Sequence, residues 1–148
     1  MLISQRIVQV GLFLVAAIAF LGGSLQMYLG EPVTTPRLDN VHRFTAAVYL
    51  STGFINLWAA LTIRTQGNLV YLLALGVLLT GIGRLVSIGQ VGLPEPASLW
   101  VAYLIPELLL PFIIALAHTA TNRDASNRLA AAQPYNREGM PSEGVSND

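Results

Sequence analysis

Four long apolar segments separated by short polar turns constrain the fold of this chain more than any other feature. They cover about residues 7–29, 41–63, 69–88 and 99–120. A helix needs ~20 apolar residues to cross the ~30 Å hydrocarbon core of a bilayer, and each segment is about that long. Short connections place consecutive helices side by side and antiparallel. The sequence therefore predicts an all-α fold, an integral membrane four-helix up-down-up-down bundle.

The composition supports a membrane protein and excludes several functions. The chain has 148 residues, of which 53% are hydrophobic and 11% charged, and this is too apolar for a soluble domain of its size. Its 8 basic residues, all arginine, balance 8 acidic ones, so there is no electrostatic footprint for nucleic acid. With no cysteine and only two histidines, we expect no metal site and no cofactor.

Polar residues and helix breakers set the expected helix ends. Asp39 and Asn40 are suited to cap the second helix, because an Asx side chain accepts from free backbone N–H groups. Gly89 is the expected end of the third helix. Pro106 and Pro111 lie inside the fourth segment, where each removes one backbone hydrogen bond and bends the helix. Residues 121–148 are polar and are expected to form a largely disordered tail, with at most a short surface helix at 125–132.

The arginines predict the orientation. One side of the predicted membrane holds Arg6, Arg64, Arg123, Arg128 and Arg137, and the other holds Arg37 and Arg43. The positive-inside rule then puts both termini in the cytoplasm of a multi-pass protein of the cell inner membrane. A cleaved signal peptide is the alternative for the first segment, although Gly22-Gly23-Ser24 fits an Ala-x-Ala cleavage site poorly.

Arg84 is the most unusual residue, because it lies in a long apolar run that carries no other charge. A charge there costs about 2.5 to 3.5 kcal/mol on insertion scales and usually finds a partner inside the protein. At ~1.5 Å per residue, Arg84 lies roughly 6 Å and Glu107 roughly 12 Å from the outer helix ends, within reach of each other. The predicted ligand-binding or ion-pair cluster has five residues, with two secondary ones: Asp39, His42, Arg43, Arg84 and Glu107, then Tyr103 and Ser87.

Helical faces place further residues around this cluster. Trp100, Tyr103, Glu107, Ile114 and His118 share one face of the fourth helix. His42, Tyr49, Gly53 and Asn56 share a face of the second helix, which suits a cavity or a helix contact. The small residues Gly76, Thr80, Gly83 and Ser87 form a stripe on the third helix, which we expect to pack inward. His118 is expected to be an interfacial residue whose polar tip reaches water.

Several short motifs in this order resemble a known family. They are Leu38-Asp39-Asn40 followed by His42-Arg43-Phe44, then Gly83-Arg84-Leu85-Val86-Ser87, Gly92-Leu93-Pro94 and Glu107-Leu108-Leu109-Leu110-Pro111. They resemble a bacterial family of small four-helix membrane proteins catalogued as domain of unknown function 4345. The resemblance implies the architecture and the importance of Asp39, Arg43, Arg84 and Glu107, and it implies no activity. The layout is more loosely similar to DoxX-like and sterol-isomerase-like families.

Three functions remain open at this stage. The first is a non-enzymatic membrane protein whose cluster binds a small polar ligand or a lipid headgroup, with the arginines as binding groups. The second is a membrane-embedded isomerase-type enzyme with Glu107 and His42 as acid and base. The third is an accessory subunit of a membrane complex that uses the segment from Thr121 onward as its contact. The alternative to all three is a purely structural role, in which the Arg84–Glu107 pair only holds two helices together. The expected partners are the lipid bilayer and the ligand, and protein partners are unknown.

Overall fold

The computed structural model describes residues 2–30 and 34–132 of the chain. Its helices are α1 (Ile3–Leu29), α2 (Pro36–Leu61), α3 (Leu69–Val91) and α4 (Ala97–Ala132), with a short 3-10 helix, η1 (Ile63–Thr65). Each of the four α-helices is long and apolar enough to cross a membrane. The predicted all-α, four-helix membrane bundle is thereby confirmed.

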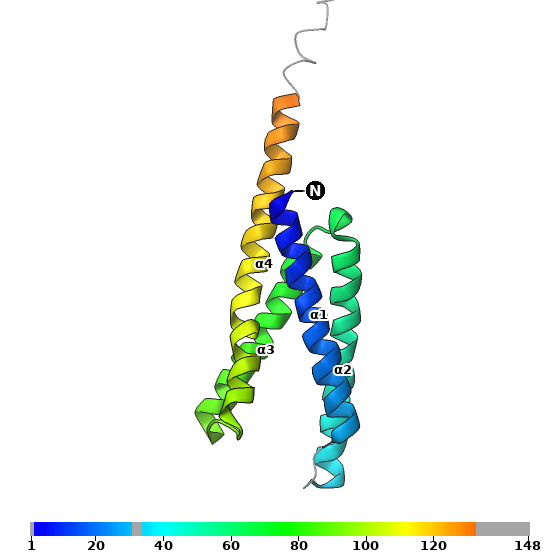
Figure 1. Ribbon diagram of the computed structural model, residues 1–148, viewed down its shortest axis with the longest axis vertical. Helices are drawn as coiled ribbons and strands as arrows, with labels where there is room; N and C mark the ends of the chain where they lie inside the picture. The colour runs from blue at the N-terminus through cyan, green and yellow to red at the C-terminus, as the bar shows by residue number, and fades with distance from the viewer. Residues whose placement is uncertain (1, 31–33, 133–148) are drawn as a thin grey trace, which may run out of the picture.

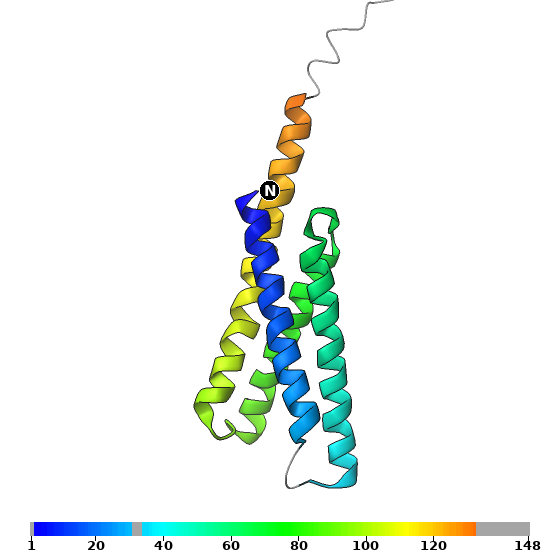
Figure 2. The same ribbon diagram turned by 45° about the vertical axis from the view of Figure 1, so that its right-hand side comes forward.

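The helices form two antiparallel hairpins, α1 with α2 and α3 with α4 (Figure 1). The start of α1, the α2–α3 connection and the long extension of α4 lie together at one end, which we call the terminal end (Figures 1 and 2). The start of α2 and the α3–α4 turn lie at the opposite end, which we call the loop end. The two hairpins are close at the terminal end and diverge toward the loop end (Figure 1).

The buried core lies in the terminal half of the bundle. It joins the first half of α1 to the end of α2, the start of α3 and the second half of the membrane-spanning part of α4: Val8, Leu12, Val15, Ala59, Ala60, Ile63, Val70, Ala74 and Ile114. α1 packs along α2 and also contacts α4, α3 packs on α4, and α2 makes few contacts with α3. Among the described residues, the loop-end half therefore has no equivalent apolar core between the hairpins.

Glycines allow the closest helix contacts. A Cβ on Gly11 of α1 would lie 2.7 Å from Ile114 Cγ1 of α4, and one on Gly23 would lie 2.8 Å from Leu50 Cγ of α2. Small residues at such crossings let helices approach in lipid, where apolar surface alone gives little drive to associate. α1 is accordingly held against a different neighbour near each of its ends.

Large apolar side chains cover the outside of all four helices. Leu21, Phe44, Leu72 and Leu116 are examples, each more than half exposed. A soluble protein of this size rarely exposes so continuous an apolar surface. In a bilayer these side chains face lipid, which agrees with a multi-pass membrane protein.

Two predicted helix starts differ from the structure. α2 begins at Pro36 and its N-cap is Thr35, whose hydroxyl accepts from the backbone N–H of Leu38 at 3.3 Å. Proline is favoured at the first helical position because its missing N–H would have no helical partner there, so the Thr-Pro pair starts the helix earlier than Asp39 and Asn40 were expected to. Asp39 lies in the first turn instead. α1 also begins earlier, at Ile3, because its polar first residues join the helix.

Two predicted helix ends differ as well. α3 continues past Gly89 to Val91 and ends at Gly92, whose φ of 90° is a conformation that glycine adopts readily. α4 runs without a break to Ala132, so residues 121–132 belong to it and do not form a separate surface helix. This extension contains alanine, arginine and leucine, which are strong helix formers. The disorder predicted for the rest of the tail lies outside the described residues.

The small-residue stripe of α3 does not pack inward as a unit. An added Cβ at Gly76 or Gly83 would meet no atom within 4 Å. The close contact is at Gly81 instead, where a Cβ would lie 2.9 Å from Leu108 Cδ2 and 3.3 Å from Glu107 Cβ. The face of α3 that meets α4 is therefore turned away from the predicted stripe.

Candidate functional site

A cavity of about 740 Å³ lies between the hairpins, on the loop-end side of the core, and residues of all four helices line it. Its apolar lining is Val15, Ile18, Gly22, Leu25, Leu29, Gly30, Val48, Leu72, Leu73, Gly76, Val77, Leu99, Pro106 and Leu110. Its polar lining is Gln26, His42, Thr45, Tyr49, Thr52, Asn56, Thr80, Arg84, Trp100, Tyr103 and Glu107. Sites for small molecules typically measure about 300–1,000 Å³ and combine an apolar wall with a few polar groups, so this cavity has the size and character of one.

Arg84 and Glu107 form an ion pair in the wall of this cavity. The Nε–H of Arg84 donates to Oε2 of Glu107 at 2.6 Å. Glu107 is 4% exposed, whereas the Arg84 side chain keeps 29% of its surface exposed. The close contact at Gly81, one turn before Arg84, brings α3 against the backbone of α4 at Glu107. The predicted pairing is thus present, and only the arginine side of it has a large free surface.

Two aromatic rings of α4 flank the guanidinium. The Arg84 Cζ atom lies 5.6 Å from the ring centroid of Trp100 and 5.6 Å from that of Tyr103. The negative face of an aromatic ring attracts a cation within about 6 Å, and this attraction grows when water is excluded. Tyr103 and Glu107 therefore act on the same arginine, as their one-turn spacing predicted.

Three buried polar atoms of this cavity wall have no hydrogen-bond partner. They are Asn56 Oδ1, Trp100 Nε1 and Glu107 Oε1, and within the described part of the chain they are the only buried side-chain nitrogen or oxygen atoms in that state. Leaving such an atom unsatisfied costs about 1–3 kcal/mol, so native proteins rarely do it. The concentration of all three around one cavity distinguishes this place from the rest of the bundle.

The predicted four-charge cluster divides into two separate pairs. Arg43 Nε–H donates to Asp39 Oδ2 at 2.9 Å, one turn apart on α2, and Arg43 Nη1–H donates to the carbonyl oxygen of Met27 at 2.7 Å. These side chains are 48% and 32% exposed, for Arg43 and Asp39 respectively, and neither lines the cavity. This pair ties the start of α2 to the end of α1.

The other predicted residues fall on both sides of the cavity boundary. His42 and Tyr103 line the cavity, whereas Ser87 is exposed and does not. Tyr49, Asn56 and Trp100 belong to the site but were not predicted as site residues. Their signal was the shared helical face, which groups Tyr49 and Asn56 with His42, and Trp100 with Glu107.

His118 is not an interfacial residue that reaches water. It is 3% exposed, and its Nε2 lies 3.0 Å from the carbonyl oxygen of Gly67, to which the ring N–H donates. The Tyr71 ring packs edge-on against it, with centroids 4.9 Å apart. His118 therefore fixes α4 to the α2–α3 connection at the terminal end, away from the cavity.

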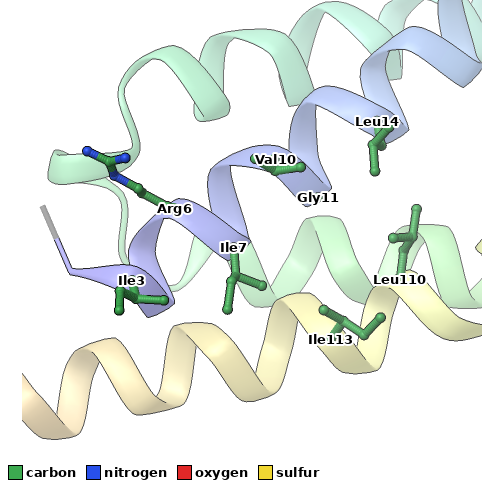
Figure 3. A pocket seen from close by; sticks show the side chains of 8 residues that line it. All are labelled: Ile3, Arg6, Ile7, Val10, Gly11, Leu14, Leu110 and Ile113. Carbon is green, nitrogen blue, oxygen red and sulfur yellow. The ribbon is translucent and has the colours of Figure 1, made fainter.

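A second depression lies on the outer face of α1 and α4 and has a volume of about 310 Å³. Figure 3 shows its lining of aliphatic side chains, which include Ile7, Leu110 and Ile113, and shows the guanidinium of Arg6 pointing away from them. It contains no polar group that would orient a ligand. No group of three or more His, Asp or Glu side chains within residues 2–30 and 34–132 is placed to hold a metal ion.

Comparison with known proteins identifies the family. No curated protein and no solved structure matches the chain. Residues 3–118 match the family described as Domain of unknown function (DUF4345), and this span covers α1, α2, α3 and α4 as far as His118, including Arg84 and Glu107. The match confirms the resemblance that the motifs indicated. The chain therefore belongs to the DUF4345 family of proteins that carry this domain of unknown function.

Proposed function

We propose that this protein binds a small amphiphilic ligand, a lipid or a lipid-like molecule, in the cavity between its two hairpins. The observation that carries the proposal is the coincidence of three features in one place. The Arg84–Glu107 pair, of which Glu107 is buried, belongs to the wall of the cavity of about 740 Å³, and so do the three residues that carry the unsatisfied polar atoms of the described chain.

The energetics favour a binding site over a simple helix lock. Burying an ion pair contributes little to stability, because the loss of hydration offsets the attraction, and apolar side chains would join α3 to α4 at least as well. A lock also needs no cavity beside it and no unsatisfied atoms around it. A ligand with a polar group beside Arg84 and Glu107 would supply the hydrogen bond that Glu107 lacks, and its apolar part would fill the rest of the cavity.

The enzymatic alternative has less support. It needs Glu107 and His42 as acid and base, and both line the cavity. However, the Glu107 carboxylate already accepts a 2.6 Å bond from Arg84, so one of its two oxygens is engaged with a fixed partner. We therefore place Glu107 as the group that positions Arg84 and binds the ligand, without turnover. An accessory role through the region after Thr121 has no specific observation in its favour.

The distribution of the arginines supports a proposal for the membrane and the orientation. We propose the inner membrane of a bacterial cell, with both termini in the cytoplasm. Support comes from the terminal end, where the helices place Arg6, Arg64, Arg123 and Arg128, against Arg37 and Arg43 at the loop end. The cavity then opens in the outer half of the bilayer.

The test fills the cavity without disturbing the helices. Gly76 lines the cavity and an added Cβ there meets no atom within 4 Å, so Gly76→Phe places a ring in the cavity. Gly83 lies two turns along the same helix, has equally open space and does not line the cavity, so Gly83→Phe is the matched control. Native mass spectrometry of the three proteins, purified in mild detergent, measures retained small molecules. We expect a bound molecule in the wild type and in Gly83→Phe and its loss in Gly76→Phe, and equal retention in all three would exclude the cavity as the site.

A further inference from the structure

We infer that the ligand is an amphiphile whose head group has no net charge and both donates and accepts hydrogen bonds, and that it enters from the bilayer between α2 and α3. A hydroxyl-bearing head group meets this description, and so does a zwitterionic one that carries N–H groups. This inference rests on the proposed function and adds to it the chemical class of the ligand and its route.

The charge of the cavity wall determines the charge of the head group. Arg84 and Glu107 neutralise each other, and among the described lining residues the only other basic one is His42. An added net charge would enter a cavity whose described lining is largely apolar and offers no further charged side chain of the opposite sign, and burying a charge in that state is costly. A head group without net charge avoids this cost, whereas a fatty acid anion or an alkyl ammonium ion does not.

The unsatisfied atoms determine the hydrogen bonds. Glu107 Oε1 and Asn56 Oδ1 are acceptors and need a donor from the ligand. Trp100 Nε1 is a donor and needs an acceptor, as do the guanidinium N–H groups on the exposed side of Arg84. A hydroxyl group donates and accepts at the same atom, so one hydroxyl can serve both kinds of group. An ester, which only accepts, leaves the Glu107 oxygen beside Arg84 unsatisfied.

The packing of the helices determines the route. α2 makes few contacts with α3, while every other neighbouring pair in the bundle packs extensively. The cavity is not sealed by packed side chains along this seam, because Val48 of α2 and Leu72 of α3 both line the cavity and remain 46% and 63% exposed. Apolar residues border the opening, so an alkyl chain can lie across it with its end in lipid.

The two tryptophans of the chain supply a direct measurement. Trp100 lies in the cavity wall, and Trp58 is 55% exposed on α2 and is not part of that wall. In the Trp58→Phe variant the fluorescence therefore reports on the cavity, and in Trp100→Phe it reports on the surrounding lipid. Both are reconstituted in dioleoylphosphatidylcholine vesicles and titrated with the dibromo derivatives of oleyl alcohol, methyl oleate, oleic acid and oleylamine, whose bromines quench tryptophan at short range.

We expect dibromo-oleyl alcohol to quench Trp100 with saturation. Its half-saturating mole fraction should be about tenfold below those of the other three probes, because one hydrogen bond to a charged group corresponds to about that factor. Trp58 should show weak, unsaturated quenching that is the same for all four. A preference for the acid, the amine or the ester would overturn the assigned ligand class.

Charge variants test the same assignment without assuming one probe. Glu107→Gln leaves Arg84 unpaired, so the preference should move to the acid, and Arg84→Gln should move it to the amine. The double variant restores a neutral cavity and with it the preference for the uncharged head group. If the preferred probe is the same in all of these variants, the Arg84–Glu107 pair does not determine the charge of the head group.

The result also separates this inference from the proposed function. Saturable quenching of Trp100 without a head-group preference would support the cavity as a binding site but would refute the assigned ligand class. If all four probes quench Trp100 as weakly as Trp58 and without saturation, both the binding site and the ligand class are refuted. Cross-linking α2 to α3 across the seam with a reducible bis-maleimide between Val48→Cys and Thr80→Cys, which both line the cavity at a similar depth, should abolish saturable quenching, and reduction of the linker should restore it. Unchanged quenching in the cross-linked protein would exclude the lateral route.

Discussion

Removing one charge of a buried ion pair leaves the other in a medium that solvates it poorly. Arg84→Ala should therefore lower the free energy of unfolding by about 3 kcal/mol, because Glu107 keeps its buried carboxylate without a counter-charge. Adding Glu107→Ala should recover part of this loss. Chemical unfolding in detergent micelles, followed by circular dichroism, measures both. A single variant as stable as the double one would show that the two side chains do not interact.

The exposed pair on α2 is the internal control for this experiment. Asp39 and Arg43 are half-exposed and one turn apart, and such helix pairs contribute about 0.3–0.5 kcal/mol. Asp39→Asn should therefore have almost no effect, since Arg43 keeps its bond to the Met27 carbonyl. Both variants break an arginine–carboxylate bond. Comparing their losses of unfolding free energy therefore contrasts a pair with a buried carboxylate with an exposed pair.

At this scale the sequence was most informative about charged residues. The depth of Arg84 and Glu107 in antiparallel helices was enough to predict that they pair, since few groups at that depth can compensate an arginine. Depth alone did not separate Asp39 and Arg43 from them, because all four lie in the same half of the bilayer. The two pairs are separate because Asp39 and Arg43 lie on a different face of α2 from the residues that line the cavity. Which face of a helix turns toward its neighbours depends on how the helices pack.

Glycine positions determine how the helices approach one another. Gly81→Val should separate α3 from α4 and cost about 1–3 kcal/mol, because its Cβ would lie 2.9 Å from Leu108 Cδ2. The same replacement at Gly83, which meets no atom within 4 Å, should be close to neutral. Thermal unfolding in detergent compares the two variants. Equal losses would mean that helix propensity, not the α3–α4 contact, sets the role of Gly81.

The glycines also explain what could not be predicted about elements. A stripe at three- and four-residue spacing identified a small-residue face on α3, but Gly81 lies off that stripe and makes the contact. Gly76 of the stripe lines the cavity instead. In lipid both a helix contact and a cavity wall favour small residues, so a pattern of small residues does not distinguish them. The predicted helix ends were similarly approximate. Two sets of residues could start α2, Thr35 with Pro36 or Asp39 with Asn40, and the helix begins at the first.

The two hairpins pack together in the terminal half of the molecule and are apart in the loop-end half. The interactions between helices differ between these halves. Apolar side chains join the hairpins at the terminal end, and His118 adds a hydrogen bond to the α2–α3 connection there. Toward the loop end the hairpins diverge, and the Arg84–Glu107 pair spans only α3 and α4 (Figure 2). The number and direction of the helices followed from four apolar segments. The divergence that creates the cavity could not be predicted in this way, because it depends on how few contacts α2 makes with α3.

The proposed orientation determines from which side of the membrane the cavity opens, and the chain allows a direct measurement. It has no cysteine, so single replacements of two exposed serines, Ser98→Cys at the loop end and Ser126→Cys on the extension of α4, have no background. With both termini in the cytoplasm, a membrane-impermeant maleimide should label the Ser98→Cys variant in intact spheroplasts. It should label the Ser126→Cys variant only after lysis, because that residue lies on the arginine-rich side. The reverse pattern would place the cavity in the inner half of the bilayer, and the ligand would then come from the cytoplasmic leaflet.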